Sequence, residues 1–364
     1  MKEYKMATVV VGLSGGVDSA VTALLLKQQG HDVIGMFMVN WEETDSHGVC
    51  TSETDFEDVK RVADAIGIPY YTVNYAKEYW DRVFEYFLKS YKEGRTPNPD
   101  VLCNREIKFG PFLNQAMLLG ADYIATGHYA KKVVRDGVSY LYKANDLNKD
   151  QTYFLNQLSQ EQLSKVMFPL AEIEKPEVRR IAEKYNLVNA KKKDSTGICF
   201  IGERNFRKFL KEYIPMQKGK ILDLDGNTLG EHDGVMYYTI GQRRGLNLGG
   251  KDGYDNDRWF VVDKDVKNNV LYVNCGECDR MYSSSLIASS FNWISGKPSE
   301  TEFDCFVKCR YRQPDQEAHI KILDNGDVFV TFKEKQRAVT LGQFAVLYAQ
   351  DGMCYGGGEI IEIK

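Results

Sequence analysis

Apolar runs alternate with amphipathic stretches through the first half of the chain. The apolar or β-branched runs predict buried strands at residues 8–11, 33–39, 70–73 and 121–126. The stretches between them place apolar side chains at helical spacing and predict helices at residues 18–30, 52–67, 79–94 and 112–119. Strands that alternate with helices indicate an α/β fold with a doubly wound parallel sheet, in which ligands bind at the carboxyl ends of the strands.

The pattern changes at about residue 215. Before it, Asp136-Gly137 predicts a hairpin, and Pro176 and Phe206 begin two further predicted helices. After it, short alternating segments such as 319–323 and 328–332 flank turns rich in Gly, Asn and Asp. We therefore expect a first α/β domain over residues 1–214, a small β-rich central domain over residues 215–282 and a C-terminal β-barrel over residues 283–364.

The first strand runs into a glycine-rich turn and a helix start, which together predict an anion-binding site. A Walker A loop would carry Lys where this chain has Asp18, and the glycine spacing of a Rossmann fingerprint is absent. The remaining Ser-Gly-Gly-Val-Asp-Ser resembles the loop of the ATP pyrophosphatases, which bind ATP and release pyrophosphate while adenylating a substrate.

Met38 and Gly127 fall at neighbouring strand ends, so we expect adenine and ribose between them and Gly12. Asp18 is expected either to hold Mg²⁺ on the pyrophosphate or to cap the helix.

The amino-acid composition is typical of one class of protein. The chain has 364 residues, 43% of them hydrophobic and 27% charged, with a net charge of −4, as in soluble globular proteins. No apolar run approaches the length of a membrane span, and Met1–Lys5 leads directly into a strand, so we expect a cytoplasmic protein with no membrane partner. Residues 175–220 hold 13 Lys/Arg against 5 Asp/Glu, a local charge of +8 that suits either a solvated face or a phosphate-backbone footprint.

Eight cysteines in a reducing compartment favour thiol chemistry or metal binding over a disulfide scaffold. In the segment 94–104, two prolines predict an extended loop that carries Asp100 and Cys103 at the mouth of the sheet. Nearby Lys92, Arg95 and Arg105 are placed to lower the pKa of the thiol, and a buried, inert cysteine is the alternative. A second polar turn, residues 194–200, carries Cys199.

Six motifs in this order resemble those of the bacterial tRNA-specific 2-thiouridylases over essentially the whole chain. They are Gly12–Ser19, Asn98-Pro99-Asp100 with Cys103, Thr126–Tyr129, Lys149–Leu155, Asp194–Gly202 and Arg310–Gln313.

The resemblance implies an enzyme that uses ATP to adenylate the C2 oxygen of the wobble uridine in tRNA. A persulfide sulfur then displaces AMP and leaves 2-thiouridine. It implies that Cys199 carries the persulfide, that Cys103 attacks it to free sulfide or to form a Cys103–Cys199 disulfide, and that Asp100 acts as acid or base. Asn98 and Pro99 would shape the pocket of the target base. The expected partners are the tRNA anticodon loop and a persulfide donor such as a cysteine desulfurase or a sulfur-relay protein.

The remaining implied residues fall into two sets. Those expected to bind ATP are Gly12, Leu13, Ser14, Gly15, Gly16, Val17, Asp18, Ser19, Met38 and Gly127. Those expected to contact tRNA are His128, Lys149, Asp150, Gln151, Arg310, Tyr311, Arg312 and Gln343. Considered without the resemblance, His128 is an ordinary strand-end histidine, and Arg310 and Arg312 share one face of a strand-like stretch.

Several alternatives stay open at this point. Cys275, Cys278, Cys305 and Cys309 have spacings that permit a zinc site, although small structural cysteines are favoured. Cys50 and Cys354 have no assigned role. The loop also suits another adenylating enzyme, such as a tRNA lysidine synthetase or an amidotransferase-type synthetase, neither of which needs the two thiols. A non-catalytic RNA-binding protein that uses ATP as a switch is the non-enzymatic alternative.

Overall fold

The computed structural model describes residues 6–41, 51–194, 206–249, 254 and 257–364. A parallel five-stranded sheet, ordered β3-β2-β1-β4-β7, forms the centre of the first domain. Its strands are β1 (Thr8–Leu13), β2 (Asp32–Val39), β3 (Tyr70–Asn74), β4 (Tyr123–Ala125) and β7 (Val166–Met167). Since the strand order reverses between β1 and β4, the ligand-binding end of a doubly wound sheet lies at their carboxyl ends.

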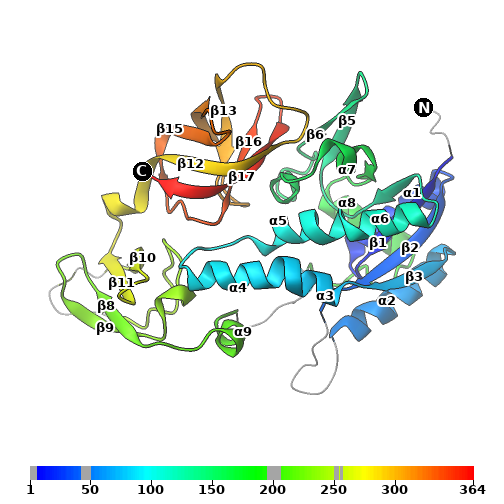
Figure 1. Ribbon diagram of the computed structural model, residues 1–364. Helices are drawn as coiled ribbons and strands as arrows, with labels where there is room; N and C mark the ends of the chain where they lie inside the picture. Colours follow the sequence, from blue (N-terminus) through cyan, green and yellow to red (C-terminus); the bar gives the residue numbers. More distant parts are fainter. Residues whose placement is uncertain (1–5, 42–50, 195–205, 250–253, 255–256) are drawn as a thin grey trace.

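Helices cover both faces of this sheet, as expected for the α/β fold (Figure 1). β1 alternates between the two layers, because Val9, Val11 and Leu13 pack into one cluster of buried side chains and Val10 into the other. The α-helices are α1 (Val17–Gln28), α2 (Thr51–Ile66), α3 (Ala76–Tyr79), α4 (Glu85–Lys92), α5 (Pro99–Cys103), α6 (Pro111–Leu118), α7 (Gln160–Ser164) and α8 (Lys175–Lys184). The π-helical turns η1 (Trp80–Phe84) and η2 (Asn104–Lys108) and the 3-10 turn η3 (Thr152–Leu155) complete the layers.

A small β-rich domain follows, with a four-stranded sheet ordered β10-β11-β8-β9. The helix α9 (Phe206–Tyr213) leads into this domain. Its elements are β8 (Gly219–Leu222), β9 (Thr228–His232), η4 (Val235–Tyr237), β10 (Trp259–Asp265), β11 (Val270–Cys275) and η5 (Asp279–Met281). α9 packs on the first domain through aromatic rings, with Phe209 and Tyr213 centred 5.7 and 4.9 Å from Phe84. This apolar contact fixes the central domain against the helices that precede α5.

The last domain is a β-barrel, as predicted. Its strands are β12 (Tyr282–Trp293), β13 (Glu302–Lys308), β14 (Gln316–Ile322), β15 (Val328–Arg337), β16 (Phe344–Tyr348) and β17 (Met353–Ile363). β12 pairs with both β15 and β17, which closes the barrel.

A hairpin of the first domain extends the sheet of the barrel. It consists of β5 (Lys131–Arg135) and β6 (Val138–Tyr142), which lie beside the barrel (Figure 1). Tyr142 lies opposite Met353 of β17. Asp136 and Gly137 both have positive φ, as the predicted two-residue turn requires. The hairpin therefore joins the first domain and the barrel through one continuous sheet.

No helix within the described ranges is both long and apolar enough to cross a membrane.

Candidate active site

The glycine-rich loop leaves β1 and enters α1 with its conformation held by its own side chains. The Ser14 N–H donates to Ser19 Oγ at 3.2 Å, and Ser19 Oγ donates to the Gly16 carbonyl at 3.1 Å. Gly15 has φ +73°, and a Cβ at this position would lie 2.8 Å from the Asp55 carbonyl oxygen. Glycine is therefore required at residue 15 by both conformation and space. The helix begins at Val17, one residue before the predicted start.

The other residues expected at the nucleotide site lie next to this loop. A Cβ on Gly12 would lie 3.7 Å from Met38 Cε and 3.4 Å from Phe112 Cζ. A Cβ on Gly127 would lie 2.8 Å from the backbone nitrogen of Ser19. Residues far apart in the sequence thus meet at the carboxyl ends of β1, β2 and β4, and close backbone approach is possible because two of them are glycines.

Asp18 lies in an ion-pair cluster beside the loop. Lys175 Nζ lies 2.7 Å from both carboxylate oxygens of Asp18, and the Tyr129 hydroxyl donates to Asp18 Oδ1 at 2.8 Å. The side chain of Asp18 caps no backbone N–H of α1, so the expectation of a helix cap is wrong. One carboxylate at the loop does fit Mg²⁺, which commonly takes one or two carboxylates together with substrate phosphates.

Asp194 extends this cluster. Its carboxylate pairs with Lys149 at 2.6 Å, Lys175 at 2.8 Å and Arg179 at 2.7 Å. Burial alone would raise the pKa of Asp194, but the hydrogen bonds from Lys149 and Lys175 outweigh it and lower the pKa to about 2. Burial and the neighbouring Asp18 raise the pKa of Tyr129, which keeps its hydroxyl a proton donor. Asp194 is therefore ionised and Tyr129 protonated at neutral pH.

The segment predicted as an extended loop contains a short helix. Pro99 occupies the first turn of α5, where the missing N–H costs nothing, and the Asn98 side chain accepts from the Val101 N–H at 3.2 Å. The prediction of an extended loop was therefore wrong for residues 99–103, because Pro97 precedes the cap and Pro99 lies in the first turn, where a helix accepts proline. Asp100 lies in the first turn of this helix, and Cys103 ends it.

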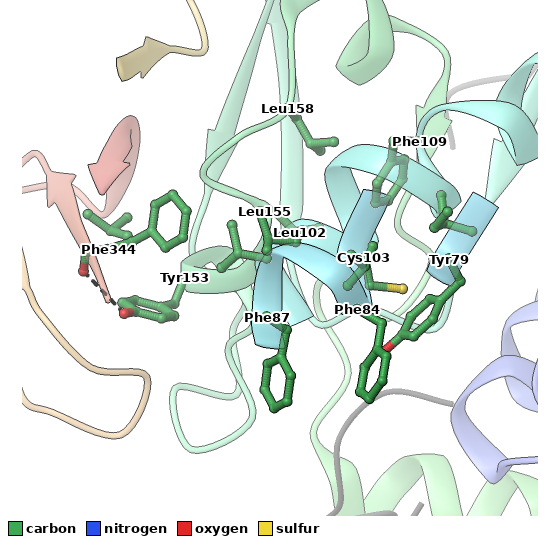
Figure 2. Close-up of a cluster of buried hydrophobic side chains, with 14 of the residues drawn as sticks. Tyr79, Phe84, Phe87, Leu102, Cys103, Phe109, Tyr153, Leu155, Leu158 and Phe344 are labelled. Carbon is green, nitrogen blue, oxygen red and sulfur yellow. Dashed lines mark hydrogen bonds between the residues drawn. The ribbon is translucent and has the colours of Figure 1, made fainter. Parts of the chain in front are cut away.

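Cys103 is completely buried, with 0% of its surface exposed. Figure 2 shows its sulfur among buried side chains that include Tyr79, Phe84 and Phe109. Two of the cations expected near the thiol are paired elsewhere, since Arg95 binds Glu93 and Glu359, and Arg105 binds Glu106. The thiol thus lies in an apolar setting.

Four of the residues expected to contact tRNA make contacts within the protein. His128 is buried and its Nδ1 lies 2.8 Å from Thr126 Oγ1; burial and the nearby Lys108 hold its pKa well below the usual value. Asp150 is buried and accepts from the Ala144 N–H and the Thr152 hydroxyl. Gln151 accepts from the Tyr129 N–H at 3.0 Å, and Lys149 pairs with Asp194.

The four expected barrel residues differ in exposure. Residues 310–312 form a turn after β13, not a strand, so the expected alternation of the two arginines does not occur. The Arg310 guanidinium donates to the Ile240 and Ala338 carbonyls and to Thr340 Oγ1, whereas Arg312 is exposed. Tyr311 packs on Phe154 with ring centroids 4.4 Å apart.

Gln343 joins the barrel to the segment before α5. Its side-chain amide donates to the Thr96 carbonyl at 2.7 Å, and its Oε1 lies 3.4 Å from Asn98 Nδ2. Thr96 Oγ1 also lies 3.3 Å from Thr239 Oγ1 of the central domain. All three domains therefore meet next to Asn98, the residue that caps the helix of Asp100 and Cys103.

The remaining predictions concern Cys199 and a possible zinc site. Cys199, with the rest of residues 195–205, lies outside the described residues, as does Cys50. Among the described residues there is no group of three or more His, Cys, Asp or Glu side chains that could hold a metal ion. This finding does not support zinc at Cys275, Cys278, Cys305 and Cys309. Cys305 and Cys309 are buried in the barrel, and burial raises the pKa of both thiols to about 12.

The structure adds residues that sequence patterns did not indicate. Lys175, Arg179 and Asn189 come from α8 and the segment after it; Asn189 Nδ2 donates to the Gly15 carbonyl at 3.1 Å. Lys175 precedes a predicted helix start at Pro176, and nothing in that local pattern distinguishes it from a surface lysine. Its role depends on a contact across 157 positions of sequence.

Three family models match successive parts of the chain. They are the tRNA methyl transferase HUP domain over residues 7–203, the tRNA methyl transferase PRC-barrel domain over residues 207–275 and the aminomethyltransferase beta-barrel domain over residues 283–360. Together with the parallel sheet and its glycine-rich loop, these matches define a three-domain protein of the tRNA-modifying HUP class.

Two curated relatives define the family more closely. A tRNA-specific 2-thiouridylase MnmA of Streptococcus mutans is 59% identical over 364 residues, which cover 99% of this chain and 96% of the relative. A protein of the same name from Exiguobacterium sibiricum is 58% identical, with 99% and 95% covered. The chain belongs to the tRNA-specific 2-thiouridylase family, a family of tRNA sulfurtransferases. Membership favours thiolation over the other adenylating reactions that the loop alone allowed.

One solved structure shows a weak likeness to this chain. A 4-thiouridine synthetase in complex with RNA and ATP is 16% identical, with a TM-score of 0.36 over 57% of this chain and 50% of the other. A likeness of this size establishes no shared site.

Proposed function

We propose that this protein thiolates the wobble uridine of tRNA at C2 in two chemical steps. ATP first transfers its adenylyl group to the C2 oxygen and releases pyrophosphate. A persulfide sulfur then replaces the adenylated oxygen, which leaves as part of AMP. Adenylation is needed because a carbonyl oxygen is a poor leaving group until it is esterified. The anticodon loop makes extrusion of the base inexpensive.

The observation that supports the first step best is the arrangement of the loop, residues 12–19. Backbone N–H groups at the start of α1 favour a polyphosphate, and the glycines allow it to approach. Met38 and Gly127 flank this end of the sheet, where adenine and ribose would lie. Asp18 would hold Mg²⁺, which supplies charge neutralisation at the phosphates when bound.

In the second step Cys199 would carry the persulfide. Attack of the Cys103 thiolate on Cys199 Sγ would break the S–S bond of the persulfide, form a Cys103–Cys199 disulfide and free hydrosulfide, which then displaces AMP at C2. In the other order, the outer sulfur of the persulfide displaces AMP at C2 first, and attack of Cys103 on Cys199 Sγ then releases 2-thiouridine and leaves the same disulfide. Asp100, in the first turn of α5, would act as acid or base near the base, with Asn98 and Pro99 beside it. The persulfide donor is a separate protein such as a cysteine desulfurase or a sulfur-relay protein.

For tRNA contact, the exposed Arg312 is the best-placed of the expected residues, because phosphates are recognised by accessible guanidinium groups. Gln343 lies beside Asn98, and Tyr311 packs on Tyr153 and Phe154; both would contact the tRNA from these positions. Lys149–Gln151, His128 and Arg310 would contribute by shaping the surface, since most of their polar atoms bind within the protein.

Isotope transfer tests the adenylation step directly. A tRNA whose wobble uridine carries ¹⁸O at C2 is incubated with enzyme, ATP, Mg²⁺ and a persulfide donor. The proposal predicts one ¹⁸O in the phosphate of the AMP produced, because the C2 oxygen leaves with the adenylyl group. Thiolated tRNA accompanied by unlabelled AMP would rule out adenylation at C2.

A further inference from the structure

Lys175 lies beside the glycine-rich loop, but neither of the two proposed chemical steps gives it a role. It begins α8, its backbone N–H donates to Asp146 Oδ2 at 2.9 Å, and only 9% of its side chain is exposed. The ammonium lies 2.7 Å from both oxygens of Asp18 and 2.8 Å from Asp194. α8 packs against α1 through Val178 and Ala182, so both partners of the pair rest on fixed helices.

The negative charge of Asp18 opposes the binding of an anion at the start of α1. Its carboxylate lies in the first turn of α1, next to the N–H groups that favour an anion. An uncompensated carboxylate there would repel a triphosphate, and the repulsion is strong because surrounding protein screens it less than water does. Mg²⁺ that arrives with ATP would offset this charge in the complex, but before ATP binds a cation of the protein must do so.

Within the described part of the chain, Lys175 is the one residue that forms an ion pair with Asp18. Tyr129 also donates to this carboxylate, but its hydroxyl is neutral. Lys149 and Arg179 pair with Asp194 instead. These three cations and two carboxylates leave one net positive charge beside the loop, which suits an anionic ligand.

We propose that Lys175 is a positioning residue of the nucleotide site, which holds and neutralises Asp18 so that the loop accepts the triphosphate of ATP. This inference rests on the proposed role of residues 12–19 as the ATP site. It assigns to Lys175 an effect on the phosphates and none on the adenosine part of the nucleotide, because its ammonium acts through the carboxylate charges of Asp18 and Asp194, and adenosine carries no charge.

Substitutions at Lys175 test this proposal. K175Q removes the charge but keeps a hydrogen-bond donor, and K175R restores the charge. K143Q is the matched control, because Lys143 also has a largely buried side chain, 12% exposed, and is paired with a carboxylate, Asp315, outside the nucleotide site. The measurements are the dissociation constants of ATP and of adenosine at a fixed Mg²⁺ concentration, with thermal unfolding of each variant.

The proposal predicts that K175Q weakens ATP binding by roughly ten- to hundredfold, as expected for loss of a charge-assisted contact, and leaves adenosine binding within about twofold. K175R should recover most of the ATP affinity, and K143Q should retain it. Equal losses for ATP and adenosine would show a merely structural lysine and overturn the proposal, as would unchanged ATP binding. If K175Q fails to fold, K175M is compared with K175R in the same way.

A wild-type protein that does not bind ATP would refute the assigned nucleotide site itself. Wild-type binding that K175Q leaves intact would refute only the role of Lys175.

Discussion

The nucleotide loop and the helix of Cys103 belong to one proposed site, yet they differ in how ready they are for chemistry. The loop presents backbone groups at the surface: Ser14 is exposed, and Gly16 and Asp18 are half-buried. Its conformation is already held by Ser19 and Asn189. Cys103, in contrast, lies among aromatic side chains with no exposed surface.

This difference indicates that the two halves of the reaction have different structural requirements. Phosphate binding needs fixed donors, which a glycine-rich turn and a helix start supply without rearrangement. Sulfur transfer needs a thiol that meets a persulfide, and a fully buried sulfur cannot do so. We therefore expect the nucleotide site to be preformed and the thiol site to open when tRNA binds.

The largest effect is expected at the two central glycines of the loop. G15A forces a side chain into a positive-φ position against the Asp55 carbonyl, so it should cost about 1–3 kcal/mol of stability. Within the part of the chain that the structure describes, a Cβ at Gly16 meets only Ser14 Oγ, at 3.4 Å, so G16V should fold but lose ATP binding. Denaturant unfolding and calorimetric ATP titration separate the two outcomes. Wild-type ATP affinity in G16V would place the phosphates elsewhere.

The rate of alkylation of Cys103 tests whether the thiol site opens when tRNA binds. In the free protein Cys103 should react slowly, and tRNA with ATP should accelerate its labelling about tenfold or more, since each ~1.4 kcal/mol of opening free energy suppresses reaction tenfold. Peptide mapping provides internal references: half-buried Cys278 should label in both states, and buried Cys354 in neither. Labelling of Cys103 that is slow with and without tRNA would argue against an opening step.

Features of the fold and the site that depend on interactions between residues close in sequence could be predicted, whereas features that depend on contacts between distant residues could not. The strands, the loop and the Asp136-Gly137 hairpin follow from local patterns, because alternation and turn chemistry act over a few residues. The cap at Asn98 is local as well, but two nearby prolines concealed the helix that it starts. The ion pair of Lys175 and Asp18 joins distant parts of the chain, and a single sequence carries no local signal for such a contact.

The two barrel arginines, one exposed and one bonded within the protein, provide a further test. Arg312 is exposed, so R312A should weaken tRNA binding and reduce the salt slope by about one if the side chain meets one phosphate. Arg310 bonds three oxygens within the protein, so R310A should lower stability by about 2–3 kcal/mol. Salt-dependent binding and thermal unfolding measure both. A reversal of these effects would show that the Arg310 side chain leaves its contacts to meet the tRNA.

The smallest effect concerns pH and His128. Burial, with Lys108 nearby, lowers the pKa of this imidazole well below 6.5, so the unfolded chain takes up a proton more readily than the folded one. Stability from this group is thus full above pH 6.5 and falls as the pH drops below it, by at most about 1.4 kcal/mol per pH unit. H128Q should flatten the wild-type slope between pH 6.5 and 5 in denaturant unfolding. An identical slope in both proteins would contradict a buried, neutral His128.

The central claim is ATP-dependent sulfur transfer to tRNA through two thiols, and mass analysis of the tRNA nucleosides tests it most directly. Wild-type protein, C103S, C199S, the double variant and the control C278S are incubated with tRNA, ATP, Mg²⁺ and a persulfide donor. We expect wild type and C278S to replace one oxygen of a single uridine by sulfur, only when ATP is present. The other three should produce no thiolated uridine while binding ATP normally. A double variant that still thiolates tRNA, or thiolation by the wild type without ATP, would contradict the account.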